Sequence, residues 1–218
     1  MLMMASVAFT GCVSDDSDDT TDTTDTTGDG TGDGTVDPVG ADTQSTLDVI
    51  HERGALKCGI KTSQFGMGYL DSDSGAYSGL DVEYCRAIAA AIGLNPDSDI
   101  EYVVASAGDR FQKLADKEID VLIRTTTWTT SRDADLNADF AGINFYDGQG
   151  ILVNTGAFAD ADSIMDLDGA NVCTTTGTTT EGNLADYFTT NNLDYTVVGV
   201  ANDAAAKIKF VNEECTAW

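Results

Sequence analysis

The side chains best suited to binding chemistry lie between Arg124 and Val153, in the stretch RTTTWTTSRDADLNADFAGINFYDGQGILV. Arg124 and Arg132 stand eight residues apart, separated by threonines and one tryptophan. A guanidinium group can donate two parallel hydrogen bonds to a carboxylate, and threonine hydroxyls and backbone amides can satisfy further ligand groups. The stretch therefore suits a small zwitterion. The alternative is a threonine-rich edge loop with a surface ion pair at Arg132.

Other chemistry has little support in the sequence. The single histidine, His51, has no cysteine near it, and no two cysteines have CxxC spacing. Zinc sites and Cys/His catalysis both need such groupings. We therefore predict no metal, no cofactor and no catalytic residue.

The strongly acidic composition of the chain argues against a nucleic-acid partner. The 37 acidic and 11 basic residues give a formal net charge of -26. Ten aspartates fall within residues 13–46, which contain no lysine or arginine, and the remaining charge of -16 is spread over the other residues. An acidic protein repels the phosphate backbone, so we expect no nucleic-acid partner.

Residues 1–12, MLMMASVAFTGC, are a short apolar run that ends in Gly11 and Cys12. The run resembles a lipoprotein signal, in which Cys12 is lipidated and becomes the mature N-terminus. An ordinary signal peptide or a fragment of a membrane anchor is the alternative. Phe9 stands where leucine is usual and no basic residue precedes the run, so we expect the true start to lie upstream.

Residues 13–46 are predicted to be a disordered acidic tether, because they hold too few apolar side chains to offset chain entropy. Such a spacer would let an anchored domain reach across roughly 30 Å. The run GDGTGDG leaves a calcium-binding repeat as an alternative, although it lacks the ligand spacing of an EF-hand.

From Thr46 onward the apolar pattern predicts alternating helices and strands. Within 79–93, apolar residues recur every three or four positions, which is the period of an amphipathic helix, with Asp81 as its cap and Gly93 as its stop. This alternation predicts a parallel sheet with right-handed crossovers. The expected elements are a short helix near Leu47 and Ile50, strands at 56–60, 100–105 and 119–123, and helices at 79–93 and 109–116.

Ligands in open parallel sheets bind at the carboxyl ends of the strands. The loops at 61–69 and 124–132 follow the first and third predicted strands, so both are expected at that edge. This placement favours the zwitterion site over an edge loop.

A strand predicted at 149–154 leaves this first unit, after which the pattern restarts. We expect two α/β lobes, 47–150 and 151–218, with a cleft between them. The second lobe is predicted to contain strands at 171–176 and 195–199 and helices at 179–191 and 201–211.

The turn at 176–181 ends a strand and begins a helix, so its free backbone amides could bind a carboxylate. The alternative is that Thr178 or Thr179 simply caps the helix.

Three segments resemble the amino-acid-binding solute-binding proteins of ABC transporters (family 3), of the general L-amino-acid type. They are GLDVEYCRAIAAAIG, DVLIRTTTWTTSRD with DFAGINFYDGQG, and VCTTTGTTTEGNLADYF. The resemblance, which runs from about Leu47 to the end, implies an α/β fold of two lobes, the type II periplasmic-binding-protein-like fold. Family members are longer and carry an acidic residue for the ligand ammonium group beyond the position of Cys215. We therefore expect a truncated chain with an incomplete second lobe.

The resemblance implies a ligand site built from both lobes. The family's arginine after the threonine run, here Arg132, binds the ligand α-carboxylate. Thr125 and Thr127 are expected to bind the α-ammonium and carboxylate groups, and Thr178 and Thr179 to complete the carboxylate site.

Three further side chains could lie near this site. Trp128 and Phe65 are candidates for contacts with the ligand side chain. Arg110 could also reach the cleft, but we expect it at the surface.

Besides Cys12, four cysteines remain, an even number that favours disulfides in an exported protein. Three pairings are possible from the sequence, and buried free thiols are the alternative. Given the two lobes that the resemblance implies, we pair Cys58 with Cys85 and Cys173 with Cys215, one bridge in each lobe.

The resemblance implies an extracytoplasmic receptor, anchored through Cys12, that delivers L-amino acids to the permease subunits of an ABC importer and acts as a monomer. One alternative is an enzyme on the same scaffold, similar to cyclohexadienyl dehydratase, which would need a general acid or base in the cleft. Another is the ligand-sensing module of a receptor, which would need a transmembrane segment after the domain.

Overall fold

The structure is a computed structural model and describes residues 44–136 and 138–218. The predicted lipidation at Cys12 and nearly all of the predicted tether lie outside these residues. The first helix, α1 (Thr46–Arg53), begins at the last residue of the predicted tether, and its N-cap Ser45 accepts a hydrogen bond from the Asp48 amide. Over the described part of the chain, the helices are too short or too polar to span a bilayer.

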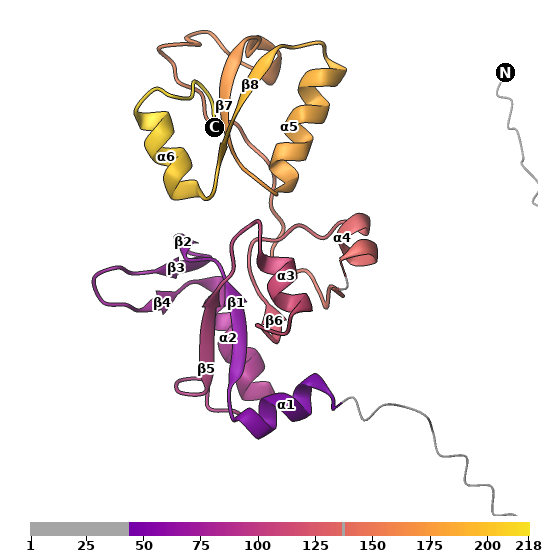
Figure 1. The fold of residues 1–218 in the computed structure, drawn as a ribbon. Coiled ribbons are helices and arrows are strands. Elements are labelled where there is room, and N and C mark those ends of the chain that lie inside the picture. The colour runs from indigo at the N-terminus through magenta and orange to yellow at the C-terminus, as the bar shows by residue number, and fades with distance from the viewer. Residues whose placement is uncertain (1–43, 137) are drawn as a thin grey trace, which may run out of the picture. The chain divides into compact units, whose positions relative to one another are not determined.

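The first lobe, which we define as α1 to α4, contains a parallel sheet with strand order β5-β1-β6 (Figure 1). Strand β1 (Leu56–Ile60) lies in the middle, between β5 (Ile100–Val104) and β6 (Val121–Leu122). Helices α2 (Leu80–Ala91) and α3 (Arg110–Ala115) make the crossovers. The predicted parallel strand-helix alternation is confirmed, although β6 is shorter than expected.

The core of the first lobe forms where α2 packs on β1. Strand β1 pairs with β5 from Leu56 opposite Ile100, and both faces of β1 are covered, as is usual for the central strand of a parallel sheet. Val82 projects from α2 against this strand. A disulfide between Cys58 and Cys85, both fully buried, joins the strand to the helix.

The segment before α2 differs from the prediction. It forms three short antiparallel strands, β2 (Ser63–Gln64), β3 (Gly68–Leu70) and β4 (Tyr77–Ser78). The N-cap of α2 is Gly79, at a φ of 113°, where a Cβ would collide with the backbone of Met67.

Asp81 does not cap α2 as predicted. It lies within the first turn of the helix and is 0% exposed. The close packing of β3 against the start of α2 requires a glycine at the cap and covers the aspartate. The predicted stop is nearly correct, because α2 ends at Ala91 and Gly93 follows at a φ of 83°.

The elements after α4 form what we define as the second lobe, which contains the parallel strands β7 (Ala170–Thr175) and β8 (Tyr195–Val200). Helices α5 (Thr179–Thr190) and α6 (Asp203–Val211) lie on either side of this pair (Figure 1). A short 3-10 helix, η1 (Ile164–Asp166), precedes β7. All four predicted elements are confirmed.

The second lobe has its own core. Leu167, Val172, Leu184 and Phe188 form one buried cluster, and a second surrounds the disulfide between Cys173 and Cys215. The buried clusters of the first lobe draw only on residues 50–123. Each lobe therefore buries its apolar side chains separately.

The predicted strand at 149–154 is wrong as a sheet strand. Only Val153 forms a bridge, with Ala217, and Leu152 exchanges backbone hydrogen bonds of 2.7 and 2.8 Å with Trp218. Ala217 in turn bridges Val172 of β7. The segment is held by a partner 66 residues further along the chain (Leu152 to Trp218), which local periodicity cannot reveal.

Candidate functional site

A cavity of about 760 Å³ lies where the carboxyl ends of the first lobe's strands face the starts of α5 and α6. This is the edge at which parallel sheets bind ligands. Residues of both lobes line the cavity. The lobes contact each other around it through the polar contacts described below. Of the predicted ligand residues, six line it: Thr125, Thr127, Trp128, Arg132, Thr178 and Thr179.

The threonine run contains a helix that the sequence did not predict, α4 (Thr130–Asp135). The Thr129 hydroxyl caps it by accepting from the Arg132 amide at 3.3 Å. This turn folds the Arg132 side chain back over the run, where its Nη1 donates to the Thr127 carbonyl oxygen at 2.8 Å. The cap thus aims the predicted carboxylate-binding arginine at the cavity.

Two hydroxyls of the threonine run form hydrogen bonds, one within the first lobe and one to the second lobe. Thr125 Oγ1 donates to Gln64 Oε1 at 3.2 Å, within the first lobe. Thr127 Oγ1 lies 2.9 Å from Thr179 Oγ1, at the start of α5 in the second lobe. The two predicted ligand groups from opposite lobes therefore already contact each other.

The turn before α5 combines capping with a free helix start. Thr178 Oγ1 accepts from the Glu181 amide at 3.2 Å and donates to the Thr175 carbonyl oxygen at 2.7 Å. Glu181 Oε2 accepts from the Gly177 amide at 2.9 Å. The Thr178 hydroxyl is thus a cap, and the unpaired amides of the first helical turn remain to meet an anion.

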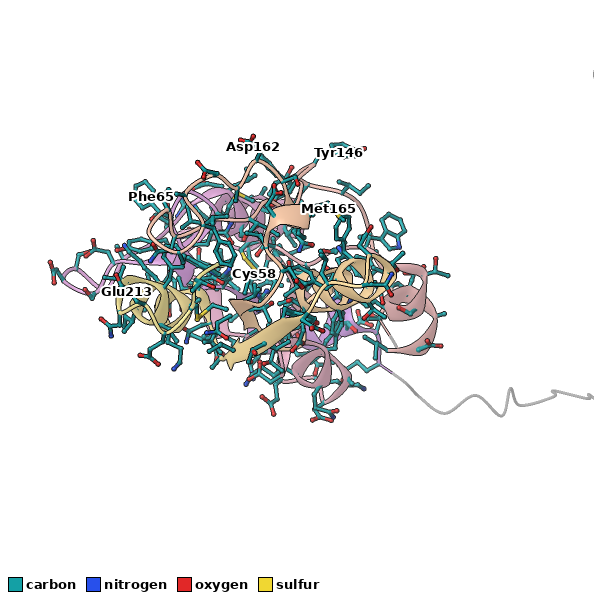
Figure 2. The ribbon with its side chains drawn as sticks, turned by 90° about the horizontal axis from the view of Figure 1, so that it is seen from above. Cys58, Phe65, Tyr146, Asp162, Met165 and Glu213 are labelled. Carbon is teal, nitrogen blue, oxygen red and sulfur yellow. A yellow bond between two sulfur atoms is a disulfide. The ribbon has the colours of Figure 1, made fainter. Side chains whose placement is uncertain are left out.

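The two predicted aromatic contacts have different outcomes. Trp128 lines the cavity and stacks on Phe140, with ring centroids 5.5 Å apart and planes at 7°. Phe65 is 85% exposed, lies at the edge of the described side chains (Figure 2), and does not line the cavity. It precedes Gly66, at a φ of 82°, and the turn there directs Met67 to the cavity instead. The expectation for Phe65 is not supported.

Arg110, expected at the surface, is 2% exposed and lines the cavity. Its Nη1 donates to the Ala107 carbonyl oxygen, and its Nη2 donates to the Gly177 carbonyl oxygen of the second lobe at 3.3 Å. The guanidinium carbon lies 4.9 Å from the ring centroid of Phe111. Burial, with the nearby charges of Arg124 and Arg132, lowers the pKa of Arg110 to about 9. The surface assignment is wrong because the helix start points inward from the sheet edge.

Arg124 and Lys61 are cavity cations that are not among the predicted ligand residues. Arg124 is 8% exposed and donates through Nη1 to the Ala105 carbonyl oxygen. Lys61 Nζ donates to Gln64 Oε1 at 3.0 Å and pairs with Asp203, at the start of α6 in the second lobe. Lys61 directly follows β1 and Arg124 lies two residues after the end of β6, and this position at a strand end is the signal that could have identified both.

Asp81 lies behind this cavity wall as a buried acid. Among the described residues, no donor makes a well-formed hydrogen bond to either carboxylate oxygen. Burial raises the pKa of Asp81, while the charges of Arg124 and Lys61 and the nearby Asn144 side chain act in the opposite direction. Burial outweighs these attractions, so the Asp81 carboxyl keeps its proton to a higher pH than an ordinary aspartate does.

The single histidine of the chain lies away from the cavity. His51 lies on α1, where its Nε2 is 2.9 Å from the Ile92 carbonyl oxygen, and it does not line the cavity. Within residues 44–136 and 138–218, no three His, Cys, Asp or Glu side chains cluster closely enough to hold a metal ion.

Several known proteins are similar in sequence to this chain. A family model for bacterial extracellular solute-binding proteins, family 3, matches residues 56–214. The glutamate/glutamine/aspartate/asparagine-binding protein BztA of Rhodobacter capsulatus is 45% identical over 82% of this chain and 52% of its own length. The general L-amino acid-binding periplasmic protein AapJ of Rhizobium johnstonii is 43% identical over 75% of this chain and 48% of its own. The chain thus spans about half the length of the curated relatives it matches.

A solved structure shares the fold. The ABC transporter periplasmic binding protein from Brucella ovis, with glutathione bound, has a TM-score of 0.74 and 42% identity. The match covers 80% of this chain and 54% of that protein. The fold is therefore that of the type II periplasmic binding proteins, as the sequence predicted.

Proposed function

Because the chain belongs to the bacterial extracellular solute-binding proteins of family 3, we propose that it is a receptor that binds L-amino acids and delivers them to the permease subunits of an ABC importer. The position of Arg132 carries this proposal. Its guanidinium group lines a cavity bounded by both lobes and is held over the Thr127 carbonyl. A ligand carboxylate there would accept charge-assisted hydrogen bonds.

The lining suits the head group that all α-amino acids share. Arg132 and the first amides of α5 face the α-carboxylate, and the hydroxyls of Thr125 and Thr127 face the α-ammonium group. The names of BztA and AapJ, which bind several amino acids each, support a site that recognises this head group in every ligand. Trp128 would then form part of a wall for varied side chains.

Delivery follows from lobe closure. A ligand that touches residues of both lobes stabilises the closed form by its differential affinity for that form. The permease would then recognise the closed receptor, as in other two-lobe proteins that close around a ligand.

The location and organisation of the protein are part of the proposal. We place the lobe boundary at residues 150 and 151, where the separate cores support it. The receptor would act as a monomer outside the cytoplasm, anchored through a lipid on Cys12 with residues 13–46 as its tether.

We propose binding without catalysis. Glu181 is engaged by the Gly177 amide and His51 lies away from the cavity, which leaves both poorly placed as a general acid or base. Incubation with prephenate or arogenate is expected to give no product, and formation of phenylpyruvate or phenylalanine would contradict this part of the proposal.

Calorimetry on the protein expressed from its complete reading frame tests the receptor function. Arg132→Ala is expected to weaken the binding of glutamate, glutamine and a neutral amino acid alike, by about tenfold or more, since each loses the same charge-assisted contact. Arg86→Ala is the matched control, because Arg86 pairs with Asp97 and does not line the cavity. Affinity retained in Arg132→Ala would contradict the assignment.

A further inference from the structure

We propose that the cavity selects amino acids with a second carboxylate, and that Arg124 is the residue that determines this preference for acidic side chains. The inference rests on the proposed function, because it concerns the far end of the same ligand. Charge is unevenly distributed in this chain, whose formal net charge is -26.

Three of the five arginines of the chain line the cavity, although acidic residues outnumber basic ones more than threefold. Among the described residues, none of these three lies within 4 Å of a carboxylate oxygen, whereas Arg53 and Arg86 pair with Asp120 and Asp97. The unpaired arginines are therefore concentrated in one place. They are Arg110, Arg124 and Arg132.

Arg110 and Arg124 are the two buried arginines of the cavity, and Arg124 has more hydrogen-bond donors without a partner than Arg110. Its Nη1 donates to the Ala105 carbonyl oxygen, while its Nε is buried with no partner and its Nη2 makes no hydrogen bond to the described residues. Asp203 and Asp81 attract it by charge but do not contact it, and Asp203 is already engaged by Lys61. A guanidinium group that is 8% exposed needs an anion that the described lining does not supply.

Arg110 adds to the positive charge that an anion in the cavity would neutralise, but its own side chain is already held by hydrogen bonds. Both of its terminal nitrogens donate to carbonyl oxygens, of Ala107 and Gly177, and its Nε is buried and unpaired. Its charge is desolvated beside the charges of Arg124 and Arg132. An anion that enters the cavity would relieve this repulsion, and Arg110 would attract it without being its direct partner.

The charge of the ligand determines whether the positive charge of the cavity is neutralised. The cavity lining holds four basic side chains and two acidic ones, Asp147 and Asp203. A neutral amino acid brings one carboxylate and one ammonium group, so it leaves this excess of positive charge unchanged. An acidic amino acid adds a second carboxylate, and with Arg132 on the α-carboxylate, Arg124 is the free buried partner for it.

Glutamate and glutamine provide the sharpest test, because they differ in charge and hardly in shape. In calorimetry on the protein from its complete reading frame, the wild type is expected to bind glutamate at least about tenfold more tightly than glutamine. Arg124→Gln is expected to weaken glutamate binding by about tenfold or more and glutamine binding by less than about threefold. Arg124→Lys should keep part of the preference, and Arg86→Gln, which removes the same charge away from the cavity, should change neither affinity.

The outcomes separate the inference from the receptor function. Equal affinities of the wild type for both ligands, or parallel losses in Arg124→Gln, would overturn the inference while leaving the receptor function intact. Binding of no amino acid at all would contradict the receptor function itself. If Arg124→Gln fails to fold, as judged by circular dichroism, the wild-type ratio of the two affinities decides the matter.

Discussion

The hydroxyl of Thr127, in the loop after β6, lies 2.9 Å from the hydroxyl of Thr179, at the start of α5. The two residues are 52 positions apart and belong to lobes with separate apolar cores. This contact fixes the distance between the threonine run and the helix start, so it sets how a ligand head group meets both.

Thr127→Val should weaken amino-acid binding by about three- to tenfold, because it removes one neutral hydrogen bond between the lobes and one ligand group. Thr189→Val, an exposed change in the last turn of α5, is the matched control and should leave affinity unchanged. Isothermal titration calorimetry with glutamate measures both. An unchanged affinity in Thr127→Val would show that the contact does not contribute to binding.

Asp81→Asn should change how stability depends on pH. Burial raises the pKa of Asp81, so the native state keeps a proton on this carboxyl at pH values where the unfolded chain has lost it. The wild type should therefore gain stability relative to Asp81→Asn as the pH falls from neutral towards about 4. Urea unfolding of both proteins across this range measures the difference.

Asp71→Asn is the control with the opposite sign. Hydrogen bonds from Ser74 and from the Asp73 amide lower the pKa of Asp71, so its contribution should be lost only as the pH falls below about 4. A wild-type advantage over Asp81→Asn that shrinks as the pH falls from neutral would contradict the buried-acid interpretation.

The two disulfides should each stabilise one lobe. They close loops with sequence separations of 27 and 42, which corresponds to about 3 to 4 kcal/mol each in the chain-entropy account. Cys85→Ala with Cys58→Ala should lower the free energy of unfolding by about that amount. Guanidinium unfolding without reductant measures it, with the oxidised wild type as the reference.

Peptide mapping without reductant identifies the pairs themselves. The expected products join Cys58 to Cys85 and Cys173 to Cys215. A peptide that joins Cys58 to Cys173 would contradict both the pairing and the division into lobes.

The sequence predicted the elements whose apolar pattern is local. Helix α2 and strands β1, β7 and β8 fall within one or two residues of their expected ranges, because their buried faces repeat at the helical or strand period. Helix α4 was not predicted, since it is only six residues long and depends on a cap at Thr129.

The position of a site residue was predictable where both its type and its place after a strand indicate a ligand contact. It was not predictable where contacts with distant parts of the chain determine whether the side chain is buried. Arg132 and the threonines of the run follow a strand end, so they reach the cavity as expected. The burial of Arg110 depends on its contact with Gly177, 67 residues away, and no local pattern shows that. The outward direction of Phe65 depends on a tight turn that the sequence leaves ambiguous.

The contacts that join the lobes are polar, and this affects the thermodynamics of closure. Thr127 meets Thr179, Lys61 pairs with Asp203, and Arg110 donates to Gly177, while the buried apolar clusters stay within their own lobes. Heat capacity falls on association mainly when apolar surface leaves water. Bringing the lobes together through such contacts should therefore change the heat capacity little, and the binding enthalpy should stay nearly constant with temperature.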